Sequence, residues 1–432
     1  MRFQYILFIC LFGLGSSLSA QVIGKATKGA FLLKNATLET ITDGTIKGDL
    51  LIEDGKITGI GTEVSAPAGT KTIDCTDKFV YPGFIDGGTS LGTVEVSSVS
   101  LTRDNNELGE IKPHLEALTA VNPSSVAIPV TRVSGVTTVI TKPAGGVIPG
   151  TAALINLVGY SPDEMYAGFS AVCVNFPSGA ARGRWDRRSD DDRLKEKQRK
   201  LKTLTDLWEE TKLFAKIQDA KKKDASIRQE YNPQLEAMVP VIRGKMPLFV
   251  EVNRDQDILS AIEWIKENEL KAILTGVAEG WRVAKEIAES GLPVITGPVI
   301  NIPTRGSDRY DRAYTNAAMM MKTGVTVAIR SNDTENVRDL PFHAGFAAAY
   351  GMGREEALKA ITIVPAQIMG LGEELGSLEV GKTANLFICD GDPLETKTQI
   401  EQVFIQGWEI PMDSRHSLLY EEFLDRSPGV KN

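Results

Sequence analysis

Pro82-Gly83-Phe84-Ile85-Asp86-Gly87-Gly88-Thr89-Ser90 stands at the junction between two kinds of sequence pattern. Before it, short apolar or alternating runs are separated by turn residues such as Glu53-Asp54-Gly55, which predicts a small β-sheet unit. After it, apolar β runs alternate with amphipathic helical segments, a pattern typical of a parallel sheet with helical crossovers. The stretch therefore opens the larger of two predicted domains.

The alternating region covers residues 82–375 and contains enough units for a closed barrel. Apolar β runs are expected at 137–140, 248–250, 272–274, 293–295 and 325–329, with helices at 258–268, 281–290 and 355–363. Because a (β/α)8 barrel typically takes about 250 residues, a closed TIM-type barrel is favoured over an open sheet. A charged stretch from Arg182 to Lys223 interrupts the series, and its leucine spacing predicts a solvated helical excursion.

Both chain ends are expected to contribute to the second domain. Strands are predicted at 31–33, 48–52 and 56–61 near the N-terminus and at 385–389 and 402–406 near the C-terminus. We therefore expect residues 21–81 to form the N-terminal part of a composite β-sandwich. Residues 376–432 then supply its C-terminal part and a tail, and the fold class is α/β.

The first twenty residues have the order of a secretory signal peptide. Arg2 gives a short positive region, an apolar run spans 5–14, and small residues precede Gln21. The apolar run is too short to span a bilayer comfortably, so we expect cleavage after Ala20. The mature protein would then be periplasmic or secreted, without membrane attachment.

Composition is that of an ordinary globular protein and argues against one class of partner. The chain has 432 residues, is 42% hydrophobic and carries a formal net charge of −8. Because polyanion binding depends on a basic surface that releases counterions, nucleic acid is not an expected partner. Beyond the signal peptide the cysteines are Cys75, Cys173 and Cys389, whose number and spacing do not indicate a disulfide framework.

The junction stretch and later motifs resemble the amidohydrolase superfamily. Pro82-Gly83-Phe84-Ile85-Asp86 is similar to the first-strand signature, and the stretch from Leu375 to Leu386 is similar to the segment that returns to the sandwich. The likeness is closest to the branch of imidazolonepropionase-like and exported dipeptidase-like proteins. It implies a TIM-type barrel with a β-sandwich and, by descent, a hydrolase of C–N bonds in non-peptide substrates or dipeptides.

The resemblance also implies a zinc site, whose ligands this sequence replaces. Family members place two histidines after strand 1, histidines after strands 5 and 6, and an aspartate after strand 8, and the bound metal activates water. In their places stand, in order, Gly88, Ser90, Glu251, Gly276 and Asn332. The chain has only three histidines, His114, His343 and His416, and each is expected to be structural or at the surface. We therefore expect no bound metal or other cofactor.

Several polar side chains remain at predicted C-terminal strand ends, where barrel active sites lie. They are Asp86, Lys142, Glu251, Arg330, Asn332 and Asp333, of which Asp86, Glu251, Asn332 and Asp333 are the pocket candidates. One hypothesis is a rebuilt site in which Glu251 and Asp333 offer oxygen ligands to Mg²⁺ or Ca²⁺. The other is that Asp86 is structural and Glu251 pairs with a cation such as Arg254 or Arg330.

The replaced ligands predict a degenerate metal site and weak or no activity of the chain's own. On this hypothesis the protein is a ligand-binding or partner subunit for a small molecule. It would act as a homo-oligomer or in a complex with an active paralogue. The alternative is an active amidohydrolase with a substituted oxygen-ligand site or a metal-free site.

Overall fold

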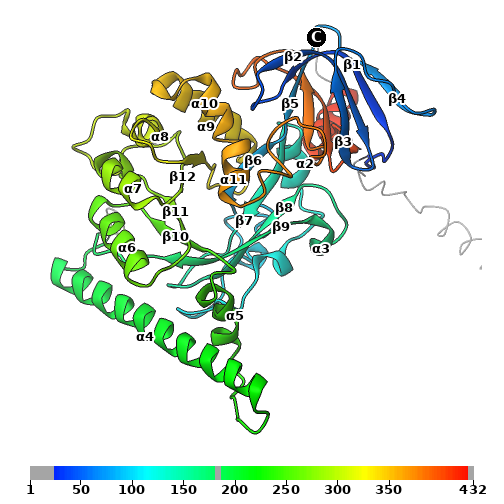
Figure 1. The fold of residues 1–432 in the computed structure, drawn as a ribbon. Helices are drawn as coiled ribbons and strands as arrows, with labels where there is room; N and C mark the ends of the chain where they lie inside the picture. The colour runs from blue at the N-terminus through cyan, green and yellow to red at the C-terminus, as the bar shows by residue number, and fades with distance from the viewer. Residues whose placement is uncertain (1–23, 181–185, 427–432) are drawn as a thin grey trace, which may run out of the picture.

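Two sheets organise the part of the chain that the computed structural model describes, residues 24–180 and 186–426 (Figure 1). The expected signal peptide, the beginning of the charged stretch at 182–185 and the end of the tail lie outside the described residues. Within the described ranges, no helix has both the length and the apolar character needed to cross a membrane.

An eight-stranded sheet forms the nearly closed barrel that the sequence predicts. Its strands, in order, are β6 (Phe84–Thr89), β7 (Val136–Thr141), β8 (Gly150–Asn156), β9 (Tyr166–Asn175), β10 (Leu248–Val252), β11 (Ala272–Gly276), β12 (Val294–Thr296) and β13 (Val327–Ile329). Neighbouring strands are parallel except around β8, which is antiparallel to both β7 and β9. The connections 142–149 and 157–165 are too short for helical crossovers, so this part differs from the all-parallel sheet expected from the pattern.

Residues after the strands close the gap between β13 and β6. The Asn332 N–H donates to the Gly88 carbonyl, and the Ser90 N–H donates to the Asp333 carbonyl, each at 3.1 Å. These bonds bring the end of the first barrel strand and the segment after the last one together.

Helices cover the outside of the barrel. They are α2 (Ala127–Arg132), α3 (Pro162–Met165), α5 (Pro233–Ile242), α6 (Asp255–Glu267), α7 (Ala284–Ser290), α8 (Arg312–Lys322), α9 (Leu340–Ala347) and α10 (Arg354–Lys359). A further helix, α11 (Ile363–Ile368), packs Ala366 against the apolar residues of the barrel interior. The single helix expected at 355–363 is instead the pair α10 and α11. Pro365 lies in the first turn of α11, where its missing N–H is tolerated.

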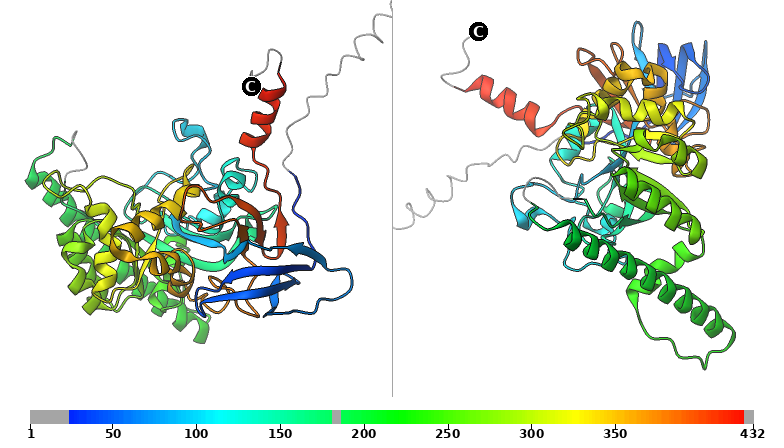
Figure 2. Two further views of the ribbon diagram at one scale, coloured as in Figure 1. Left: turned by 90° about the horizontal axis from the view of Figure 1, so that it is seen from above. Right: turned by 90° about the vertical axis from the view of Figure 1, so that its left-hand side faces the viewer.

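A long helix, α4 (Asp190–Lys223), extends away from the barrel and packs on α5 (Figures 1 and 2). Ser189 caps it by accepting the Asp192 N–H, and three aspartates in the first turn and three lysines in the last complement the helix dipole. The predicted helical excursion is thus present from Asp190 onward.

The second sheet is built from both chain ends, as expected. It contains β1 (Phe31–Glu39), β2 (Thr45–Glu53), β3 (Lys56–Gly61), β4 (Lys71–Asp74), β5 (Phe79–Pro82), β14 (Leu386–Cys389), β15 (Ile400–Ile405) and β16 (Trp408–Ile410). Beyond it, α12 (Arg415–Asp425) projects from the body with no buried residue (Figure 2).

Gly83 joins the two sheets, because β5 runs through it into β6. A Cβ at this position would lie 2.1 Å from the Thr137 hydroxyl oxygen of β7. The glycine of the Pro-Gly-Phe motif therefore lets the first barrel strand approach its neighbour closely.

Candidate functional site

A layer of polar side chains lies inside the barrel at the C-terminal ends of its strands. Alternate strand residues face the same side, so a residue two positions after an inward apolar residue also faces inward. The barrel interior includes Ile140, Phe249 and Ala328, and two positions further along stand Lys142, Glu251 and Arg330. The last inward layer of the barrel is therefore charged.

Arg330 and Glu251 form the central ion pair of this layer. The guanidinium Nη1 and Nη2 of Arg330 donate to the two carboxylate oxygens of Glu251, each at 2.7 Å. The Lys142 Nζ lies 3.4 Å from the same carboxylate, and the Thr275 hydroxyl donates to it at 3.0 Å. Arg330 is only 1% exposed. A buried bidentate pair of this kind fixes both side chains in one geometry.

Two cations face one carboxylate here, and their charges shift the pKa values. Burial by itself raises the pKa of Glu251, but Arg330 and Lys142 outweigh burial and hold that pKa well below its usual range. Burial and the charge of Arg330 lower the pKa of Lys142. Glu251 is ionised at neutral pH, and the layer is net positive whenever Lys142 is protonated.

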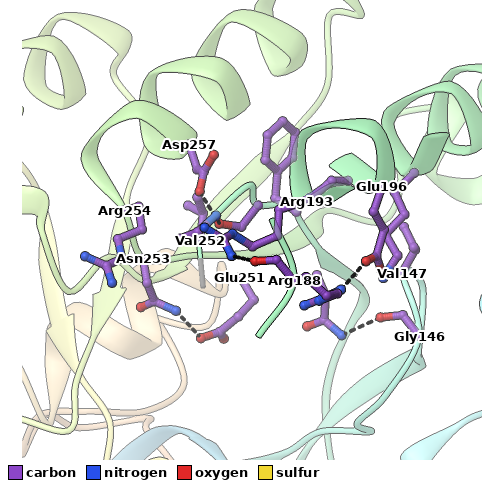
Figure 3. Close-up of a pocket in the computed structure, with 16 residues that line it drawn as sticks. Gly146, Val147, Arg188, Arg193, Glu196, Glu251, Val252, Asn253, Arg254 and Asp257 are labelled. Atoms are coloured by element: carbon purple, nitrogen blue, oxygen red, sulfur yellow. Dashed lines mark hydrogen bonds and ion pairs between the residues drawn. The ribbon is translucent and has the colours of Figure 1, made fainter. Parts of the chain in front are cut away.

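Two cavities at the barrel mouth share Glu251 and Asn253 as a common wall. The first, about 290 Å³, lies against α4 and the loop before it, and its polar lining includes Asn175, Ser178, Arg188, Arg193, Glu196, Lys200, Arg254 and Asp257 (Figure 3). The second, about 260 Å³, is bordered by Trp281, Asn301, Thr304, Arg312, Arg330 and Asn332. In Figure 3 the Asn253 amide points toward the Glu251 carboxylate, 3.5 Å away.

Asp86 lies outside both cavities and serves barrel closure. Its carboxylate is fully buried and accepts the N–H groups of Gly88 and Ser331 at 3.0–3.2 Å. Burial raises the pKa of Asp86 to about 6, although these hydrogen bonds oppose the shift. Asp86 thus ties β6 to the residues after β13.

The other two pocket candidates after β13 have different positions. Asn332, with φ +53°, lines the second cavity. Asp333 caps the following turn, because its carboxylate accepts the N–H groups of Thr334, Glu335 and Asn336 at 2.6–3.1 Å. Glu251 and Asn332 therefore reach the barrel mouth, whereas the Asp333 carboxylate is engaged by backbone.

A larger side chain would be crowded at Gly88 and would clash at Gly276. A Cβ at Gly88 would lie 3.1 Å from the Arg330 Cδ, so the Arg330 side chain fills the space that a residue at 88 would enter. At Gly276, with φ +83°, a Cβ would come within 2.5 Å of the Asn253 Oδ1 and 2.6 Å of the Glu251 Oε1. Ser90 is the third position where a family metal ligand is replaced. Its hydroxyl oxygen accepts a hydrogen bond from the Asn105 amide at 3.3 Å.

Glu279, another buried carboxylate, is not among the site residues predicted from the sequence. It accepts hydrogen bonds from Arg254 at 2.9 Å, from Thr304 at 2.7 Å and from the Arg305 Nε at 2.8 Å. Burial by itself raises the pKa of Glu279. The hydrogen bonds from Arg305 and Thr304 outweigh burial and lower this pKa to about 2. Its place three residues after β11, at a strand end, is the signal that could have identified it.

His343 forms a hydrogen bond with the backbone of the loop 297–304. Its Nδ1 accepts the Ile300 N–H at 3.0 Å, and burial lowers its pKa to about 4. The imidazole is therefore neutral and structural, in a loop that borders the second cavity.

Known proteins share this architecture. Residues 282–409 match the sequence family described as the amidohydrolase family. The amidohydrolase tasK of Hapsidospora irregularis is 22% identical over 394 residues, which cover 83% of this chain and 39% of that protein. The imidazolonepropionase of Syntrophobacter fumaroxidans is 33% identical over 111 residues, which cover 25% of each protein. The crystal structure of an amidohydrolase from Thermotoga maritima MSB8 matches with a TM-score of 0.79 and 27% identity, over 89% of this chain and 100% of that chain.

These findings support the predicted relationship of the chain to the amidohydrolase superfamily. The matched stretches span less than half the length of the two curated relatives. The predicted recognition of the superfamily and of its barrel-plus-sandwich fold is confirmed.

The zinc ion that the superfamily implies does not fit the residues of this site. Arg330 and Lys142 place two cationic groups around Glu251, and a metal cation beside them would meet direct repulsion. Within residues 24–180 and 186–426, no three His, Cys, Asp or Glu side chains lie together as a metal site would require. The donor set of this layer suits an anion or an amide better than a cation.

Proposed function

We propose that this protein binds a small molecule at its barrel mouth and does not hydrolyse it by the metal-dependent route. The bidentate Arg330–Glu251 pair is the observation that carries the proposal. It places a guanidinium among the strand ends where the superfamily holds its metal. The pair also occupies the carboxylate of Glu251, which is the one side chain of this layer that could have bound a metal ion.

The nature of the relatives supports a ligand with an amide-like C–N bond. One relative is named an amidohydrolase and the other an imidazolonepropionase. Cavities of about 290 and 260 Å³ suit a small molecule. Asn253 and Asn332 border the second cavity with amide groups, which can both donate to and accept from such a bond.

Metal analysis combined with a hydrolysis assay tests the proposal. The purified protein is dialysed with zinc, its zinc content is measured, and dipeptides, hydantoins and imidazolones are assayed with and without added zinc. We expect far less than one tightly held zinc per chain and no zinc-dependent turnover. The matched variant Glu251→Gln distinguishes specific from adventitious metal. Stoichiometric zinc that Glu251→Gln removes, or zinc-dependent turnover, would contradict the proposal.

A metal-free hydrolase is the second candidate, and Lys142 is the observation that favours it. Its amine is held beside Arg330 and Glu251, and burial lowers its pKa, so a larger fraction of it is neutral than of an ordinary lysine. A neutral amine can accept a proton from water that attacks an amide carbonyl. Turnover without metal that rises with pH and disappears in Lys142→Met, but not in the neighbouring Thr141→Val, would establish this candidate.

We further propose export and a role as a subunit. The positive, apolar and small-residue order of the first twenty residues supports a cleaved signal peptide. N-terminal sequencing of protein from the extracytoplasmic fraction should begin near Gln21, and an intact Met1 there would contradict this. Native mass spectrometry tests whether the chain forms a homo-oligomer or a complex with an active paralogue.

A further inference from the structure

We propose that the second cavity binds the carboxylate group of its ligand through Arg312. The inference rests on the proposed function, since it names the chemical class of the ligand for the same barrel mouth. The cavity, about 260 Å³, lies between the ends of β10 to β13, the loop 297–304 and the start of α8. Arg312 is the first residue of α8 and lines it.

Arg312 has no acidic partner among the residues that the structure describes. Its guanidinium carbon lies 4.4 Å from the ring centroid of Trp281, and its Nη1 is 3.7 Å from the Met319 sulfur. Stacking on an indole orients a guanidinium and leaves its edge available for hydrogen bonds. The Arg312 guanidinium can therefore donate hydrogen bonds to an anion in the cavity.

The two acidic residues close to Arg312 in sequence, and the carboxylates Glu279 and Glu251 at the strand ends, form ion pairs with other cations. Asp308 pairs with Arg282, Asp311 with Arg309, Glu279 with Arg254 and Arg305, and Glu251 with Arg330. The lining of the cavity therefore contains two guanidinium groups, from Arg312 and Arg330, against one carboxylate, that of Glu251. The excess positive charge belongs to Arg312, since the other two groups neutralise each other.

The rest of the cavity indicates a monoanionic carboxylate rather than a phosphate. A single unpaired guanidinium matches one unit of negative charge, and its planar fork fits the two oxygens of a carboxylate. The remaining walls are neutral, with the apolar side chains of Pro298, Val299 and Ile302 and the amides of Asn301 and Asn332. Such walls suit the body of a small organic acid and offer no second cation for a dianion.

Calorimetric titration with matched acids and amides tests the inference. The probes are propionate and propionamide, benzoate and benzamide, and N-acetyl-L-leucine and its primary amide, with inorganic phosphate as a further probe. A hydrogen bond to a charged group contributes roughly 10- to 100-fold in affinity. We expect at least one acid to bind about 10-fold or more tightly than its amide. That preference should disappear in Arg312→Met and in Arg312→Gln.

Arg282→Met combined with Asp308→Asn is the matched control, because the second change removes the carboxylate that Arg282→Met alone would leave free near Arg312. The Arg282 guanidinium also lies on Trp281, 4.1 Å from the ring centroid, but it pairs with Asp308 and is not part of the cavity wall. This variant should keep the preference for the acid. Circular dichroism and thermal melting confirm that each variant folds, and two different replacements at 312 guard against a single misfolded one.

The outcomes separate this inference from the proposed function. Equal binding of acid and amide, a preference that survives both Arg312 variants, or tight binding of phosphate would overturn the carboxylate assignment. Failure of all three acids to bind at millimolar concentration would overturn it as well. Zinc-dependent hydrolysis of N-acetyl-L-leucine would refute the proposed function, and an Arg312-dependent preference for the acid in the same titrations would leave the carboxylate site standing.

Discussion

Replacing Arg330 with methionine should destabilise the barrel strongly. The Arg330 side chain is 2% exposed and the Glu251 side chain 24% exposed, so the pair lies mostly away from water. Arg330→Met keeps much of the volume but removes both 2.7 Å hydrogen bonds to Glu251. The carboxylate then remains in place with only Lys142 and weaker neutral partners.

The magnitude follows from the surroundings of the carboxylate. Removing one partner of a buried ion pair costs about 3–5 kcal/mol of unfolding free energy. Glu251 retains Lys142 at 3.4 Å and the Thr275 hydroxyl at 3.0 Å, so the lower end of that range, about 3 kcal/mol, applies. Unfolding entropy is about 2.1 cal/mol/K per residue, so for roughly 400 residues a loss of about 3 kcal/mol lowers the Tm by about 4 °C.

A double-mutant cycle with Glu251→Gln isolates the pair. Calorimetric melting of the two single variants and the double variant gives the coupling free energy, which should be about 2 kcal/mol, because the double variant contains neither buried charge of the pair. An unchanged Tm in Arg330→Met would refute the reasoning. Purely additive effects in the cycle would do the same, because they would mean that the two side chains do not interact.

Three further results are expected. Gly88→His should lose about 1–3 kcal/mol in denaturant titrations, because Arg330 fills the space, and adding Arg330→Ala should recover part of that loss. Gly276→Ala should cost about 2–4 kcal/mol in the same assay, since the position has φ +83° and two oxygens within 2.6 Å of a Cβ; wild-type stability there would contradict the geometry. His343 has its pKa lowered to about 4, so the unfolded chain binds its proton first as the pH falls, and stability decreases from about pH 6.5 down to about pH 4. Relative to His343→Asn, which cannot titrate, the wild type should lose up to about 3 kcal/mol over that window, and parallel pH–stability curves would disprove this.

Local patterns were sufficient to predict most of the fold. Period-two apolar runs and amphipathic helices predicted the barrel, and the strands at both chain ends predicted the second sheet, because these periodicities directly reflect which faces are buried. They did not reveal that β8 is antiparallel. An apolar run such as 150–156 has the same pattern in either direction, and only the short connections on both sides decide it.

The replaced metal ligands were also visible in the sequence, since identity alone excludes an imidazole at Gly88, Ser90 or Gly276. What the sequence left open was the partner of Glu251. Arg254, three residues away, pairs with Glu279, whereas Arg330, 79 residues away, forms the bidentate pair.

Likewise, nothing local marked Arg312 as an arginine without an acidic partner among the described residues. Asp308 and Asp311 lie close to it in sequence but pair with Arg282 and Arg309. Alternation along a strand determines which way each side chain points. Which opposite charges meet depends on how far the sheet curves and where distant strand ends converge, and that is decided only when the barrel closes.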